Sequence, residues 1–132
     1  MPIILRRRTR QLRRDVLARR DHSGADLQGA KLFDLDLHGK VFRGANLSRG
    51  DLTACNLIGA DLEGADLTAT FLTGAQLNRA NLRGANLTGV SALATDFGDA
   101  DMAGATLDRV LYDYSTTWPP GVLPPRPHSR FV

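Results

Sequence analysis

The chain has 132 residues, which suits a single domain with a modest core. Aromatic residues make up only 6% of it and glycine accounts for 13 residues, so we expect a regular core built from small side chains. The single cysteine excludes an intrachain disulfide framework, no stretch approaches the ~20 apolar residues of a membrane span, and the net charge of +3 conceals two oppositely charged regions.

The first region, residues 1–24, is strongly basic. Residues 1–20 carry eight arginines against one acid, a net charge of +7, whereas residues 21–112 carry seven basic and twelve acidic residues, a net of −5. The apolar run at residues 3–5 is too short for a secretory signal, and arginines follow it instead of preceding it. We therefore expect a cytoplasmic protein. The arginines considered for partner contacts are Arg6, Arg7, Arg8, Arg10, Arg13 and Arg14.

Residues 9–20 have the composition of a helix. Leu12 and Val16, with Leu17 beside them, offer a narrow apolar stripe, and residues 21–24 are typical of a helix end. We expect this short helix to cover the open end of the structure that follows.

A five-residue repeat then runs from residue 25 to residue 112 without a slip. Its consensus is Ala-(Asp/Asn)-Leu-x-Gly. The 18 unit centres, 13 of them leucine, are Leu27, Leu32, Leu37, Phe42, Leu47, Leu52, Leu57, Leu62, Leu67, Leu72, Leu77, Leu82, Leu87, Ala92, Phe97, Met102, Leu107 and Tyr112. No α-helix or flat strand keeps every fifth residue on one face.

A chain that turns a corner after each unit does keep them on one face. Each unit then forms one side of a square, and four units close a coil, with the centre and the small residue two before it pointing inward. Coils stacked at about 4.8 Å, the spacing of neighbouring strands, place positions i and i + 20 in vertical columns. One such column is Asp26, Asn46, Asp66, Asn86 and Thr106, in which no two carboxylates are neighbours.

The repeat resembles the pentapeptide-repeat protein family over residues 25–112. The resemblance implies an all-β solenoid, a right-handed quadrilateral β-helix. With the capping helix before it, the predicted organisation is a basic segment at 1–24, the β-helix at 25–114, and a C-terminal cap with a proline-rich tail at 115–132.

Some positions depart from the consensus. Lys40 falls on an inward position, so we expect a local bulge or a lysine that escapes through the wall. Phe71 and Leu93 fall on outward positions, as do Phe33 and Ile58, and could seed an interface with a partner.

The C-terminal end of the repeat supplies large aromatic residues. Tyr112, Tyr114 and Trp118 are expected to cap the last coil or to form dimer contacts, and the prolines after them forbid further strands. Residues 116–119 are similar to endings in bacterial members of the family, some of which dimerise at this end.

The sequence contains no motif typical of a catalytic, metal-binding or cofactor-binding site. His22, His38 and His128 are scattered, Cys55 falls in an inward slot, and no metal-ligand spacing, nucleophile motif or phosphate loop occurs. We expect a protein that is not an enzyme and that has no cofactor.

Three functions that use only the outer surface of the protein fit this sequence. The first is a protein-binding scaffold that uses its walls and ends, with a partner that the sequence does not identify. The second is a DNA mimic that acts on DNA gyrase, as the resemblance implies. The third is binding of nucleic acid or an anionic surface by the basic head, with the strong salt dependence of phosphate contacts.

Overall fold

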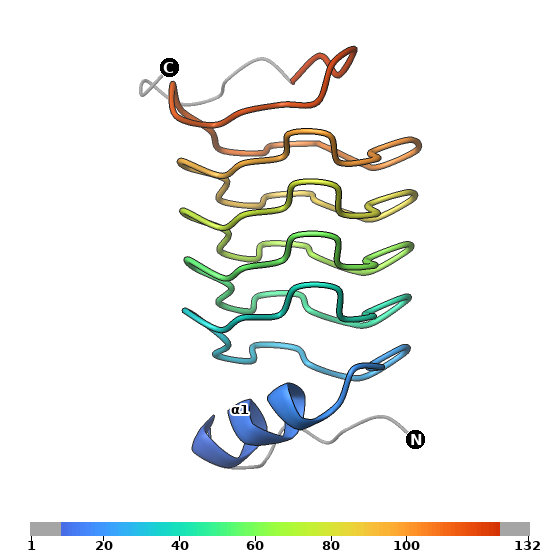
Figure 1. Ribbon diagram of the computed structural model, residues 1–132. Helices are drawn as coiled ribbons and strands as arrows, with labels where there is room; N and C mark the ends of the chain where they lie inside the picture. Colours follow the sequence, from blue (N-terminus) through green and yellow to red (C-terminus); the bar gives the residue numbers. More distant parts are fainter. Residues whose placement is uncertain (1–8, 125–132) are drawn as a thin grey trace.

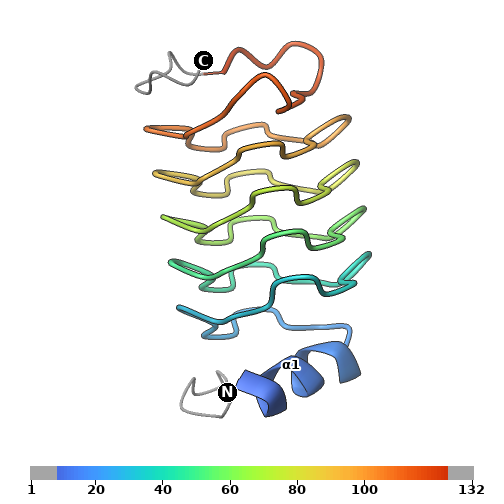
Figure 2. The same ribbon diagram turned by 90° about the vertical axis from the view of Figure 1, so that its left-hand side faces the viewer.

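The computed structural model describes residues 9–124, which form a column of stacked coils with a helix, α1 (Thr9–Ala18), at one end (Figures 1 and 2). Within this part of the chain the β-structure consists of 16 isolated parallel bridges, from Asp21↔Val41 to Asp96↔Thr117. Each side of a coil contributes a single bridge residue, because the chain soon turns again at the next corner.

The bridges give the coil a period of four repeat units. All of them except the last join positions i and i + 20, and the predicted column of Asp26, Asn46, Asp66, Asn86 and Thr106 is confirmed. The backbone pairs on both sides of each bridge residue: the Asp51 N–H donates to Ala30 O at 2.9 Å, and the Leu32 N–H donates to Asp51 O at 2.8 Å. Four columns of such pairs hold the coils together.

The repeat centres fill the inside of the column, as predicted. Leu57, Leu62, Leu67 and Leu72 are each at most 1% exposed, and the small residues between them are buried as well. Where a small inward residue carries a polar atom, that atom donates to a backbone oxygen: the Thr70 hydroxyl bonds Leu47 O at 2.9 Å and the Cys55 thiol bonds Leu32 O at 2.8 Å. Burial raises the pKa of this thiol to about 11, so Cys55 is a neutral core residue.

The corners require left-handed backbone. From His22 to Leu107, the second residue after each centre has a positive φ. Where that residue is not glycine, as at Ala69 with φ of 57°, an L side chain occupies a conformation that costs it energy.

We expect Ala69→Gly to stabilise the protein by about 1 kcal/mol, because glycine adopts this conformation without a steric penalty. The measurement is the denaturant midpoint in an equilibrium unfolding experiment. The reverse change at an equivalent corner, Gly64→Ala, should lower the midpoint, since Gly64 has φ of 66° and open space around it. Shifts of the same sign in the two variants would contradict this account.

Helix α1 covers the N-terminal end of the column through the residues predicted from its stripe. Leu12 and Val16 are buried, whereas Leu17 is exposed. No helix in the described residues is long and apolar enough to traverse a bilayer.

Two side chains of the first coil hold the C-terminal end of α1. His22 Nε2 lies 2.9 Å from both Val16 O and Arg19 O, and its ring stacks on Phe42 at 5.2 Å between centroids. Of the two outcomes expected for Lys40, the bulge does not occur, because the neighbouring bridges keep their spacing of 20 residues, and the ammonium instead turns away from the core and donates to Leu17 O at 3.1 Å and Arg19 O at 2.6 Å. His22 occupies the centre position one unit before Leu27, so the coils begin one unit earlier than the sequence pattern suggested.

The coils also extend further at the C-terminal end. The last bridge, Asp96↔Thr117, joins positions that are one residue further apart than in every other bridge, so one residue is inserted between Tyr112 and Trp118. Beyond the insertion the register resumes: Thr116 takes the small inward position and donates to Ala92 O at 2.7 Å, and Trp118 takes the place of a centre.

Candidate functional site

The four walls of the column carry different outward side chains. In every unit, the residue before the centre lies in the middle of a wall, and the two residues after the centre form the corner. Since every fourth unit lies on the same side of the square, each wall can be read as a column of outward positions.

One wall, which we call the apolar wall, gathers large hydrophobic side chains. It is formed by the outward residues of the units centred on Leu32, Leu52, Leu72, Ala92 and Tyr112, and its large apolar residues are Phe33, Phe71, Leu93, Leu111 and Tyr114. Phe71, near mid-height, is 53% exposed, and Tyr114 at the top is 89% exposed. Elsewhere in the described residues the only exposed large hydrophobic side chains are Leu17 and Leu123, which lie near the two ends of the column.

The wall built on His22, Phe42, Leu62, Leu82 and Met102 has the opposite character. Arg43 pairs with the carboxylates of both Asp61 and Glu63, and Arg83 pairs with Asp101 at 3.1 Å. The acidic residues of this wall are therefore interleaved with arginines instead of forming a continuous anionic face.

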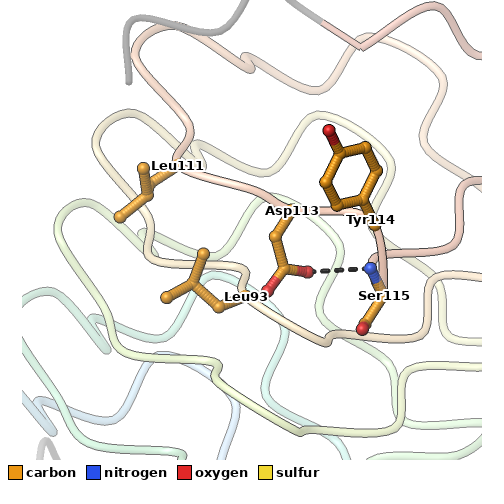
Figure 3. A pocket seen from close by; sticks show the side chains of 5 residues that line it. All are labelled: Leu93, Leu111, Asp113, Tyr114 and Ser115. Atoms are coloured by element: carbon orange, nitrogen blue, oxygen red, sulfur yellow. Dashed lines mark hydrogen bonds between the residues drawn. The ribbon is translucent and has the colours of Figure 1, made fainter. Parts of the chain in front are cut away.

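The top of the apolar wall is hollowed. A pocket of about 380 Å³ is lined by Leu93, Leu111, Asp113, Tyr114 and Ser115 (Figure 3). The one-residue insertion after Tyr112 shapes it, because the extra residue lets Tyr114 stand clear of the wall while Asp113 turns back toward the coil below.

Asp113 is the charged group of this pocket. Its Oδ1 accepts the N–H groups of Ala94 and Ser115, both at 3.0 Å, and lies 3.3 Å from the Thr116 hydroxyl. These hydrogen bonds, that of Ala94 first among them, lower the pKa of the carboxyl, so it is ionised at neutral pH. The pocket thus combines apolar walls with one fixed negative charge.

The lower end of the apolar wall is partly covered by the chain itself, although Phe33 remains 39% exposed. Arg13 of α1 places its guanidinium 4.6 Å from the centroid of the Phe33 ring and donates to Lys31 O at 3.2 Å. Beside it, a groove of about 420 Å³ between α1 and the first coil is lined by residues that include Arg10, Leu17 and Leu35.

The predicted site residues fall into separate places. Arg6, Arg7 and Arg8 lie outside the described residues, while Arg10, Arg13 and Arg14 lie on α1. Phe71 and Leu93 share the apolar wall, a grouping that counting in steps of 20 would have revealed. Leu111 and Asp113 were not singled out from the sequence, since Leu111 occupies an ordinary variable position and Asp113 acquires its role from the insertion.

The aromatic residues of the C-terminal end do not form one cluster. Trp118 stacks on Phe97 at 5.0 Å and meets the edge of Tyr112 at 5.5 Å, so Tyr112 and Trp118 close the core of their own chain. Tyr114 lines the pocket instead. Within residues 9–124, no group of three His, Cys, Asp or Glu side chains could hold a metal ion.

Comparison with known protein families identifies the repeat. A family model described as pentapeptide repeats matches residues 23–57, 55–91 and 80–110, in eight copies. No curated protein sequence matches the chain.

Solved structures of pentapeptide-repeat proteins are similar to the chain. Rfr23 from the cyanobacterium Cyanothece 51142 is 37% identical, with 74% of this chain and 63% of that protein covered and a TM-score of 0.36. The protein alr5209 from Nostoc PCC 7120 is 30% identical, with 87% and 85% covered and a TM-score of 0.41. QnrB1, a plasmid-mediated fluoroquinolone resistance protein, is 19% identical, with 71% and 57% covered and a TM-score of 0.33. The matched part of the chain therefore spans less than two thirds of the length of Rfr23.

Proposed function

Because the chain belongs to the pentapeptide-repeat family, with the right-handed β-helix of that family, we propose that it is a non-enzymatic scaffold whose apolar wall binds a protein partner. The observation that carries the proposal is the concentration of outward hydrophobic side chains on this wall. Scattered apolar surface residues need no explanation, but a contiguous group of them is typical of a protein interface.

The filled interior supports binding on the outside. The leucine centres from Leu27 to Leu87 are almost completely buried, so these coils enclose packed side chains where a ligand cavity would have to be. The outward residues, in contrast, can vary without disturbing this core. A rigid column of this kind presents a preformed surface, which reduces the entropic cost of binding.

The apolar wall is uncharged in its upper part. Between Phe71 and Leu111 its outward positions include Thr73, Ser91 and Ala94, and none of these carries a charge, whereas the lower coils of the same wall carry Lys31, Asp34 and Asp51. Depletion of charge around exposed aromatic residues is the compositional mark of the centre of an interface.

Site-specific photocrosslinking tests the proposal. A photoreactive phenylalanine analogue at position 91, directly above Phe71 on the same wall, should give a discrete adduct in host cells. Introducing Phe71→Ser into the same chain should reduce the yield of that adduct at least fivefold. The matched control is the analogue at Gln76, which is exposed and holds the same register position on the next wall. Equal adducts from positions 91 and 76 would overturn the assignment of the wall.

The two alternative functions have weaker support. Mimicry of DNA toward DNA gyrase needs a continuous anionic face, and Arg43 and Arg83 interrupt the acidic wall. Nucleic-acid binding by the basic head would use Arg10 and Arg14 on α1, but Arg13 is already engaged with the first coil. A supercoiling assay and a salt-titrated DNA mobility shift are the measurements that test these two alternatives.

A further inference from the structure

We infer that the pocket formed by Leu93, Leu111, Asp113 and Tyr114 binds an arginine side chain of the partner protein. The inference rests on the proposed function, since it names the chemistry of what the apolar wall would recognise. It depends on the combination of three different surfaces in one hollow: aliphatic, aromatic and anionic.

The aliphatic part suits the stem of a long basic side chain. Leu93 and Leu111 line one side of the pocket (Figure 3), and the hollow of about 380 Å³ is large enough for a single extended side chain. Arginine and lysine bury their methylene groups along apolar surface while they keep the charged head at a polar partner.

The anionic part is preorganised. The hydrogen bonds to Asp113 converge on Oδ1, which fixes the carboxylate and leaves Oδ2 for a donor from outside the chain. Asp113 therefore has two roles: one oxygen holds the turn, and the other offers a charged acceptor at the edge of an apolar hollow. A purely apolar partner would leave this charge desolvated without compensation, which is costly.

The aromatic part favours arginine over lysine. The Tyr114 ring is 89% exposed and stands on the other side of Asp113 from the two leucines (Figure 3). A planar guanidinium can stack on this ring and donate to the carboxylate at the same time, whereas an ammonium acts as a point charge.

The same wall already holds an arginine in this manner at its other end. Arg13 lies over the Phe33 ring, which occupies the corner position equivalent to Leu93 three coils below, and it donates to a backbone oxygen. At the upper end the aromatic ring and the acceptor are present, but no arginine of the described residues pairs with Asp113. The partner would supply that arginine.

Fluorescence polarisation with a defined peptide tests the inference. The probe is a labelled pentapeptide with one arginine, acetyl-Ala-Leu-Arg-Leu-Ala-amide, a sequence that does not occur in this chain; the control peptide has citrulline in place of the arginine. Asp113→Asn is the informative variant, because the amide oxygen can still accept from Ala94 and Ser115 while the charge is lost. We expect it to weaken binding about tenfold, and Tyr114→Leu about threefold. Asp108 is an exposed carboxylate on the neighbouring wall, so Asp108→Asn is the matched control and should leave binding unchanged.

Two results would overturn the inference: equal affinity of the citrulline and arginine peptides for the unaltered protein, or equal affinity of Asp113→Asn and the unaltered protein for the arginine peptide. A melting curve of Asp113→Asn shows whether the turn is intact. If Asp113→Asn has no effect on the adduct formed from position 91 while Phe71→Ser removes it, the inference fails and the proposed function stands. If neither substitution matters, both fail.

Discussion

Replacing Leu67 by alanine is expected to destabilise the protein by about 3–4 kcal/mol. Leu67 is fully buried in the middle of the column, with the inward residues of the coils below and above it stacked on either side. Truncation removes buried methyl groups and leaves a cavity, because the backbone ladder on all four walls prevents the coils from closing around the gap. The melting temperature should fall by roughly 10–15 °C, measured by circular dichroism.

Leu123→Ala is the matched control for this experiment. It is the same chemical change on a side chain that is 90% exposed, so we expect a loss of less than about 0.5 kcal/mol. An equal loss of stability in the two variants would mean that the leucines at every fifth residue do not form the core. The comparison therefore tests the fold as well as the position.

Much of the column could be predicted because one physical rule repeats 18 times. A leucine centre, a small partner and a turn residue are needed in every unit, so each unit reports the same register independently. Inward Leu57 and the column from Asp26 to Thr106 follow from that register alone. Even the departure at Lys40 could be anticipated, because a buried unpaired charge is too costly to remain inside.

The two ends were harder to predict because the rule changes there. His22 fills an inward position although it is polar, and it can do so because the carbonyl groups at the end of α1 are within reach of its ring nitrogen. Trp118 also fills an inward position, but the insertion after Tyr112 shifts it by one residue from the expected spacing. Residues 116–118 do follow the order of a repeat unit, with a small inward residue (Thr116), a polar residue (Thr117) and a large centre (Trp118). This order was the signal in the sequence that could have indicated one more unit.

The candidate site was only partly accessible from the sequence. Phe71 and Leu93 could be identified as outward residues, and steps of 20 place Leu111 in the same column as Phe71. The pocket could not be derived in this way, because it depends on how the inserted residue turns Asp113 and Tyr114, and periodic spacing carries no information about an aperiodic loop.

Replacing Trp118 by alanine is expected to cost about 2–3 kcal/mol. The indole covers Phe97 in a stacked contact and meets the edge of Tyr112, so its removal opens the C-terminal end of the core to water. The loss should be smaller than for a fully buried tryptophan, since Trp118 is only partly buried. Thermal unfolding measures it, and Tyr114→Ala serves as the control because that side chain is 89% exposed.

Light scattering on the same variant separates a cap from a dimer contact. If Trp118 serves only as a lid for its own chain, Trp118→Ala should melt at a lower temperature while its molar mass stays the same or rises, because exposed Phe97 and Tyr112 favour association. If the C-terminal end is instead a dimer interface built on Trp118, a dimeric parent should become a monomer. The packing of Trp118 against two rings of its own chain leads us to expect the first result, and loss of a dimer would refute it.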